Sequence, residues 1–196
     1  MYGKDVNDVS RPVLIDSSRR LVTAPIGGKY ADAVLAGRVF VAANQAAVAV
    51  TAAFAKSYTG LVVANPAASG KNLIMLEFGY AADAAVPAAT GIGLMTGMDA
   101  GDAAAAIAAR NRLMGSSNTS VALPDDGCTL IGTPVLEQVF AAAWAEATTA
   151  GTLMPPNIVE LDGSLIVTPG YYVAAYSTAG LTAAMLFHFI WEEVDE

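Results

Sequence analysis

The chain has few of the residues from which active sites and metal sites are usually built. Its 196 residues include one cysteine and one histidine, and charged residues make up only 14% of it, against roughly 25% in a typical soluble domain. Cys128 cannot form an internal disulfide, and we expect it to be a small buried apolar side chain. Zinc sites built from several Cys or His ligands are excluded. We therefore expect neither cofactor nor metal, and the composition does not predict an enzyme.

Positive charge is also scarce. Ten Lys and Arg residues stand against 18 Asp and Glu, which gives a net charge of -8. A protein that binds nucleic acid needs a cationic surface to displace counterions from phosphate. The pair Arg19-Arg20 is too small for such a surface, so we expect no nucleic-acid partner.

Long apolar runs are missing as well. The richest run, "AAVAVTAAFA" at 46–55, has about half of the roughly 20 residues that cross a bilayer. The opening stretch "MYGKDVNDVSRPV" is polar where a secretory signal would be apolar. The expectation is a protein synthesised in the cytoplasm, without a membrane partner.

The stretch "NPAASGKN" at 65–72 comes near a phosphate-binding loop but does not complete one. That motif needs a glycine where this chain has Asn65 and a hydroxyl side chain where it has Asn72. The residues that follow, "LIMLEFGYAA", indicate a strand, whereas a phosphate-binding loop opens a helix. We interpret 65–72 as a turn between two strands.

What the chain does have is a large share of small and apolar residues, 55% in the broad hydrophobic class. A surface this poor in charge favours burial against other subunits. The length suits one domain with a sizeable core. We therefore predict one domain that forms oligomers.

Short apolar segments separated by Gly, Pro and Asn predict a mainly β protein, a β-sandwich or jelly roll. Residues 1–30 are predicted to form an extended arm, and residues 31–196 a single domain. Two helices are expected in the middle of the chain, over 99–115 with Asp102 as its cap and over 133–151 from its apolar spacing, although 133–151 also fits a strand. The predicted strands lie at 33–44, 46–54, 60–65, 73–82, 90–97, 163–170, 171–178 and 181–196, with further strand-like pieces at 120–124 and 128–134.

Catalysis needs convergent polar groups, and this chain offers few. One histidine would suffice for a Ser-His-Asp triad, but the nucleophile-elbow pattern G-x-S-x-G does not occur in the sequence. His188 lies in "LFHFIW", where a strand places it on one face with Leu186 and Ile190, in a core or half-buried position that favours a structural role. Glu77 interrupts an apolar strand, and it is expected either to face solvent or to pair with an arginine such as Arg38. The pair Asp125-Asp126 is interpreted as part of a turn, because the spacing of a calcium loop is absent.

Two stretches resemble structural proteins of tailed bacteriophages. One is "LVVANPAASGKNLIMLEF", and the other is "GSLIVTPGYYVAAYSTA" together with "FHFIWEEV". The type they are most similar to is the jelly-roll cement, or decoration, protein of the capsid. The resemblance covers about a quarter of the chain, and it lies in strands and turns rather than in a catalytic signature.

This resemblance implies a homotrimer on the outer capsid surface of the virion, bound to the major capsid protein and bridging neighbouring capsomers. The arm, through Arg11, Arg19 and Arg20, is expected to reach an acidic surface of a neighbour. Two alternatives remain open: a head-fibre or tail-associated jelly roll, and a carbohydrate-binding or hydrolytic β-domain.

Overall fold

The computed structural model of the protein describes residues 2–4, 10–12, 28–83, 90–143 and 157–196. The chain divides into two compact units, Met1–Ala36 and Gly37–Glu196. In the first unit, strand β1 pairs antiparallel with β2, and one short helix, α1, follows. These elements are β1 (Tyr2–Lys4), β2 (Ser10–Pro12) and α1 (Ala31–Leu35).

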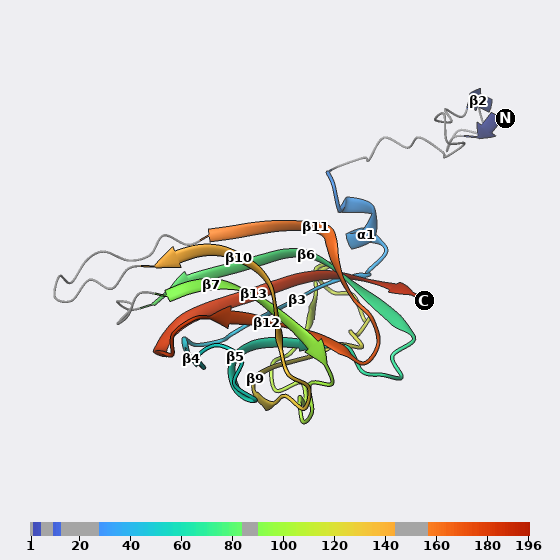
Figure 1. The fold of residues 1–196 in the computed structure, drawn as a ribbon. Helices are drawn as coiled ribbons and strands as arrows, with labels where there is room; N and C mark the ends of the chain where they lie inside the picture. The colour runs from blue at the N-terminus through green and yellow to red at the C-terminus, as the bar shows by residue number, and fades with distance from the viewer. Residues whose placement is uncertain (1, 5–9, 13–27, 84–89, 144–156) are drawn as a thin grey trace. The chain divides into compact units, whose positions relative to one another are not determined.

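The second unit is a sandwich of two antiparallel β-sheets (Figure 1). The five-stranded sheet has the order β10-β7-β12-β5-β9, and the six-stranded sheet has the order β11-β6-β13-β3-β8, with β4 also paired to β13. The bounds are β3 (Val39–Ala43), β4 (Val48–Val50), β5 (Ser57–Ala64), β6 (Lys71–Ala82), β7 (Thr90–Met98), β8 (Arg110–Asn111), β9 (Leu123–Thr129), β10 (Val135–Ala143), β11 (Asn157–Val167), β12 (Tyr171–Ser177) and β13 (Leu181–Asp195). The prediction of a mainly β sandwich is confirmed.

The main core lies between the two sheets. Alternation along β13 turns Phe187, Phe189 and Trp191 inward, because successive side chains of a strand point to opposite faces. They meet apolar side chains such as Leu61 and Ile92 from the five-stranded sheet. Burial of large aromatic and aliphatic side chains at about 1.5–3 kcal/mol each makes this layer the main source of stability.

The five-stranded sheet is also covered on its outer face. Tyr58, Met95 and Tyr172 belong to a second buried cluster, to which Ala100 and Ala103 contribute from the segment 99–109. This sheet is therefore buried on both sides, which explains why β5 and β12 consist largely of buried residues.

The predicted helix over 99–115 is wrong. The segment runs as turns and bends to the two-residue strand β8, and Asp99, Gly101 and Ala105 have positive φ. Asp102 accepts a hydrogen bond from the Thr129 amide and so does not cap a helix. Packing on the sheet overrides the helix propensity of the alanines, which amounts to only a few tenths of a kcal/mol per residue.

The predicted helix over 133–151 is also wrong in its described part. Val135–Ala143 is β10, paired with β7 through a register that shifts twice. These shifts bring apolar residues to helix-like spacing in a strand, since each bulge moves the following side chains to the other face. Residues 144–156 of the prediction lie outside the described residues.

Two further local predictions need correction. The segment 33–44 begins in α1 and becomes a strand only at Val39. Asp125 and Asp126 lie inside β9 and not in a turn. The Asp125 carboxylate nevertheless bonds the backbone as turn-forming aspartates do, by accepting from the Gly127 amide.

The stretch 65–72 connects β5 to β6, as predicted. The Ser69 amide donates to the Pro66 carbonyl, and Gly70 adopts a φ of 64°, a conformation open to glycine at no steric cost. Asn65 is buried, and its Nδ2 donates to the carbonyls of Lys71 and Val167. This side chain ties the turn to the end of β11.

The order of the strands bears on the finer, jelly-roll prediction. Eight strands follow the orders β3-β13-β6-β11 and β5-β12-β7-β10, and most of their connections cross between the sheets. That arrangement is compatible with the paired Greek keys of a jelly roll, which stays a prediction. Across the described residues, no helix has the length and apolar character needed to span a membrane.

Candidate functional site

The side of the sandwich formed by β10 and β11 carries exposed apolar side chains. Each of these strands ends its sheet, and both send residues into the shared core. Large apolar side chains stand out on either side, including Val135 at 63%, Ile158 at 60% and Val139 at 52% exposure. We call this region the open edge, and its exposed residues are Val135, Leu136, Val139, Ile158 and Ile166.

The register explains why these side chains are exposed. Leu136 lies opposite Met95 and Val139 opposite Gly93, so both extend the outer face of the five-stranded sheet beyond its cover. Ile158, opposite Gly79, lies on the outer face of the other sheet. Among the described residues, no further strand pairs with β10 or β11. An edge of this kind with apolar side chains around it is the usual template for pairing with another chain.

The opposite side, formed by β8 and β9, is built differently, and we call it the closed edge. β8 has two residues, and β9 contains Pro124 and two aspartates. The segment 102–107 bonds to β9: the Ile107 amide donates to the Pro124 carbonyl, and the Ala104 amide donates to the Asp125 carboxylate. Short strands, proline, charge and a covering loop are the devices that keep an edge from pairing.

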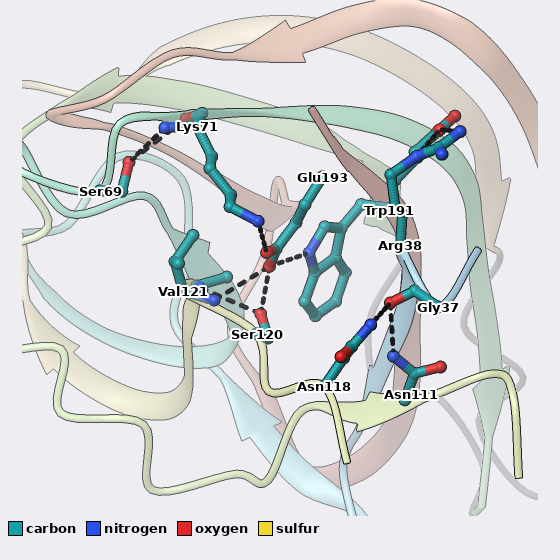
Figure 2. A network of polar contacts seen from close by, with 12 residues as sticks. Gly37, Arg38, Ser69, Lys71, Asn111, Asn118, Ser120, Val121, Trp191 and Glu193 are labelled. Atoms are coloured by element: carbon teal, nitrogen blue, oxygen red, sulfur yellow. Dashed lines mark hydrogen bonds and ion pairs between the residues drawn. The ribbon is translucent and has the colours of Figure 1, made fainter. Parts of the chain in front are cut away.

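A polar cavity of about 410 Å³ lies at one end of the six-stranded sheet. Glu193 of β13 lines this cavity. It is only 1% exposed, so its carboxylate is a buried charge. As Figure 2 shows, its Oε1 accepts hydrogen bonds from Ser120 Oγ at 2.5 Å, from the Val121 amide at 3.1 Å and from Trp191 Nε1 at 3.3 Å. This carboxylate fixes the loop before β9 to the last strand.

The second oxygen of this carboxylate is less well satisfied. Lys71 Nζ is 3.9 Å from Glu193 Oε2, which is too long for a hydrogen bond. Oε2 is buried and has no hydrogen-bond partner in the described residues.

At the rim of the cavity, Arg38 pairs with Glu192 at 2.8 Å. Asn111 and Asn118 both donate to the Gly37 carbonyl (Figure 2).

The three arginines predicted for partner binding lie in the first unit or outside the described residues. Arg11 is the middle residue of β2, opposite Gly3 of β1, while Arg19 and Arg20 lie outside the described residues. Their role therefore stays a prediction.

His188 and Glu77 do come together. His188 Nε2 lies 2.7 Å from Glu77 Oε1, and both side chains are about 30% exposed. The pairing of Glu77 with Arg38 was wrong, since Arg38 pairs with Glu192. Of the two predicted positions for His188, core or half-buried, the structure shows the half-buried one, and Leu186 and Ile190 are half-buried as well. The His188 ring lies over Gly79, where a Cβ would come within 1.9 Å of Cε1.

Cys128 is a buried thiol in the closed edge, as predicted. Burial raises its pKa to about 12, and the charges of Asp125 and Asp102 add to this effect. The thiolate is the reactive form of cysteine, so Cys128 is unreactive at neutral pH. No group of three or more His, Cys, Asp or Glu suited to a metal ion occurs among the described residues.

The sequence predicts solvated charge for the acidic residues at the C-terminus, which is wrong for the buried Glu193, and it gave no sign of the open edge. Glu193 follows Phe189 and Trp191 at a spacing of two, so strand alternation alone would have placed it inward. The open edge was hidden because 133–151 was assigned to a helix. Comparison of the chain with protein-family models, with curated proteins and with solved structures finds no match.

Proposed function

We propose that this chain is a structural protein that assembles with copies of itself through the open edge and attaches to a larger protein shell. The observation that carries the proposal is the contrast between an edge with exposed Val135, Leu136 and Val139 and an opposite edge that is closed. A monomer with a long, apolar, unpaired edge is prone to uncontrolled pairing. Regulated assembly turns the same surface into an interface.

The assembly is a homotrimer. A threefold ring needs a heterologous contact, in which the open edge of one copy meets a different surface of the next. A strand order compatible with a jelly roll and the resemblance of two stretches to capsid cement proteins support this choice. The low charge of the chain, 14%, fits a protein that hides much of its surface against copies of itself and the shell.

The partner is the major capsid protein, on the outer capsid surface of a virion. A cement protein binds the assembled lattice and not its free subunits, so its binding free energy adds to the stability of the lattice. Several modest contacts per trimer then hold together through their number. The net charge of -8 keeps such an external protein from binding the genome.

Sedimentation equilibrium of the full chain tests the assembly. We expect a particle of three times the chain mass of 20.0 kDa, and a monomer at micromolar concentration would overturn the proposal.

Deletion of residues 1–25, with binding measured on undecorated capsids, tests the arm. Unchanged binding would refute the role of Arg11, Arg19 and Arg20. Stoichiometry on virions separates cement, present in many copies, from a fibre or tail protein.

A further inference from the structure

The cavity beside Glu193 has the size of a small-ligand site and a mainly polar lining. Its volume of about 410 Å³ lies within the roughly 300–1,000 Å³ of typical ligand pockets. Its walls come from the start of β3, the start of β6, the loop before β9 and the end of β13. The polar residues that line it are Arg38, Lys71, Ser117, Asn118, Thr119 and Glu193.

An unpartnered acceptor marks where a ligand would bind. Glu193 Oε1 has three donors, whereas the buried Oε2 has no hydrogen-bond partner in the part of the chain that the structure describes. Leaving a buried acceptor unpaired is costly. Lys71 Nζ is 3.9 Å away and Oε2 is almost fully covered, so a ligand atom that bonds to both groups has to displace this half-exposed side chain.

The charges around the cavity decide the class of ligand. Arg38 and Lys71 are balanced by Glu192 and Glu193, so the site favours neither an anion nor a cation. The atom between Oε2 and Nζ must donate to a carboxylate and accept from an ammonium group. A hydroxyl does both.

The rim extends this preference for hydroxyl groups. Ser117 and Thr119 are exposed hydroxyl side chains, and Asn118 has a carboxamide oxygen that can accept. Phe40 supplies an apolar wall. We propose that this cavity binds a cyclic polyol, the hydroxyl-rich ring of a sugar residue, with Glu193 Oε2 and Lys71 Nζ holding one hydroxyl between them.

Saturation-transfer difference NMR on the full chain tests this proposal, with glucose, galactose and myo-inositol as probes. We expect saturation to be transferred from the protein to the ring protons of at least one probe at millimolar concentration. Glu193→Gln should weaken binding about tenfold, since it replaces a charged acceptor. Because this variant loses part of a buried network, Lys71→Met and Thr119→Val serve as second variants that leave the three bonds to Oε1 intact. Glu160→Gln, an exposed carboxylate on β11, is the matched control.

Three results would overturn the proposal. The first is no transfer to any of the probes. The second is equal binding by wild type, Lys71→Met and Glu193→Gln. The third is displacement of the probe by inorganic phosphate or putrescine at lower concentration, which would show an ionic site. None of these outcomes bears on assembly through the open edge, so the two proposals fail separately.

Discussion

The open edge and the closed edge end the same two sheets on opposite sides, and the chain treats them in opposite ways. At the closed edge, Asp125 holds the Ala104 amide, Asp102 holds the Thr129 amide, and Ile107 bonds to Pro124. At the open edge, Val135 and Ile158 extend toward solvent from long strands. Bonds and proline are placed where pairing must be prevented. Among the described residues no such protection covers the other side, and the proposed assembly rests on this contrast.

The largest expected effect comes from placing charged side chains on the open edge, because charge is one of the features that keep the closed edge from pairing. The double substitution Leu136→Lys and Val139→Lys removes apolar contact worth about 3 kcal/mol, so the assembly should weaken on the order of a hundredfold. Sedimentation velocity over a dilution series measures this change. Met114→Lys, which replaces an apolar side chain 92% exposed in the loop after β8, is the matched control. Equal loss in both variants would contradict a specific interface.

The next effect comes from breaking the closed edge. Asp125→Ala leaves the Ala104 and Gly127 amides without their acceptor, which should lower the free energy of unfolding by about 2 kcal/mol. Urea denaturation measures it, with Asp126→Ala as the control at the neighbouring position. We also expect larger aggregates, because β9 loses part of its cover. Wild-type stability in Asp125→Ala would show that the loop does not hold the edge.

A smaller effect is expected from pH, because Cys128 lies within the closed edge. Its pKa rises from 9.0 to about 12 on folding, so the unfolded chain releases this proton at lower pH than the native protein. Stability is therefore fully present below pH 9 and falls as the pH rises toward 12, by about 1 kcal/mol between pH 9 and pH 10. Thermal unfolding of wild type and Cys128→Ala measures the difference in slope. Identical slopes would place the thiol in contact with solvent.

The smallest effect concerns the one carboxylate on β10. Glu137 is exposed and accepts a hydrogen bond from Thr96. Glu137→Gln keeps an acceptor and removes a charge that the interface must desolvate, so assembly should tighten about twofold to threefold. The same dilution series detects this change. Weaker assembly would mean that the carboxylate pairs with a cation of the neighbouring copy.

Much of the fold was predictable, because strand alternation and turn residues are local signals. The turn between β5 and β6 is indicated by Asn65, Pro66 and Gly70. Strand β13 is indicated by the alternation of its apolar residues. The failures lie where tertiary contacts override local preference. The alanines of 99–109 do not form a helix, because this segment packs on the outer face of the five-stranded sheet. The two register shifts of β10 give a strand the apolar spacing of a helix.

The candidate surfaces were less predictable than the fold. The inward direction of Glu193 follows from its spacing to Trp191, but the gap to Lys71 depends on how two strands and a loop meet. Exposure of Ile158 and Ile166 depends on β11 being the last strand of its sheet. Sequence patterns indicate which residues face a sheet surface, but they do not indicate whether another strand follows.

Amide hydrogen exchange at two protein concentrations tests the central claim most directly. In an assembly through the open edge, the amides of β10 (Val135–Ala143) and β11 gain protection at high concentration and lose it on dilution, because their unpaired groups meet a neighbouring copy. The amides of β9 (Leu123–Thr129) should exchange at the same rate at both concentrations. Protection of β10 that does not depend on concentration, or a change confined to β9, would contradict the account.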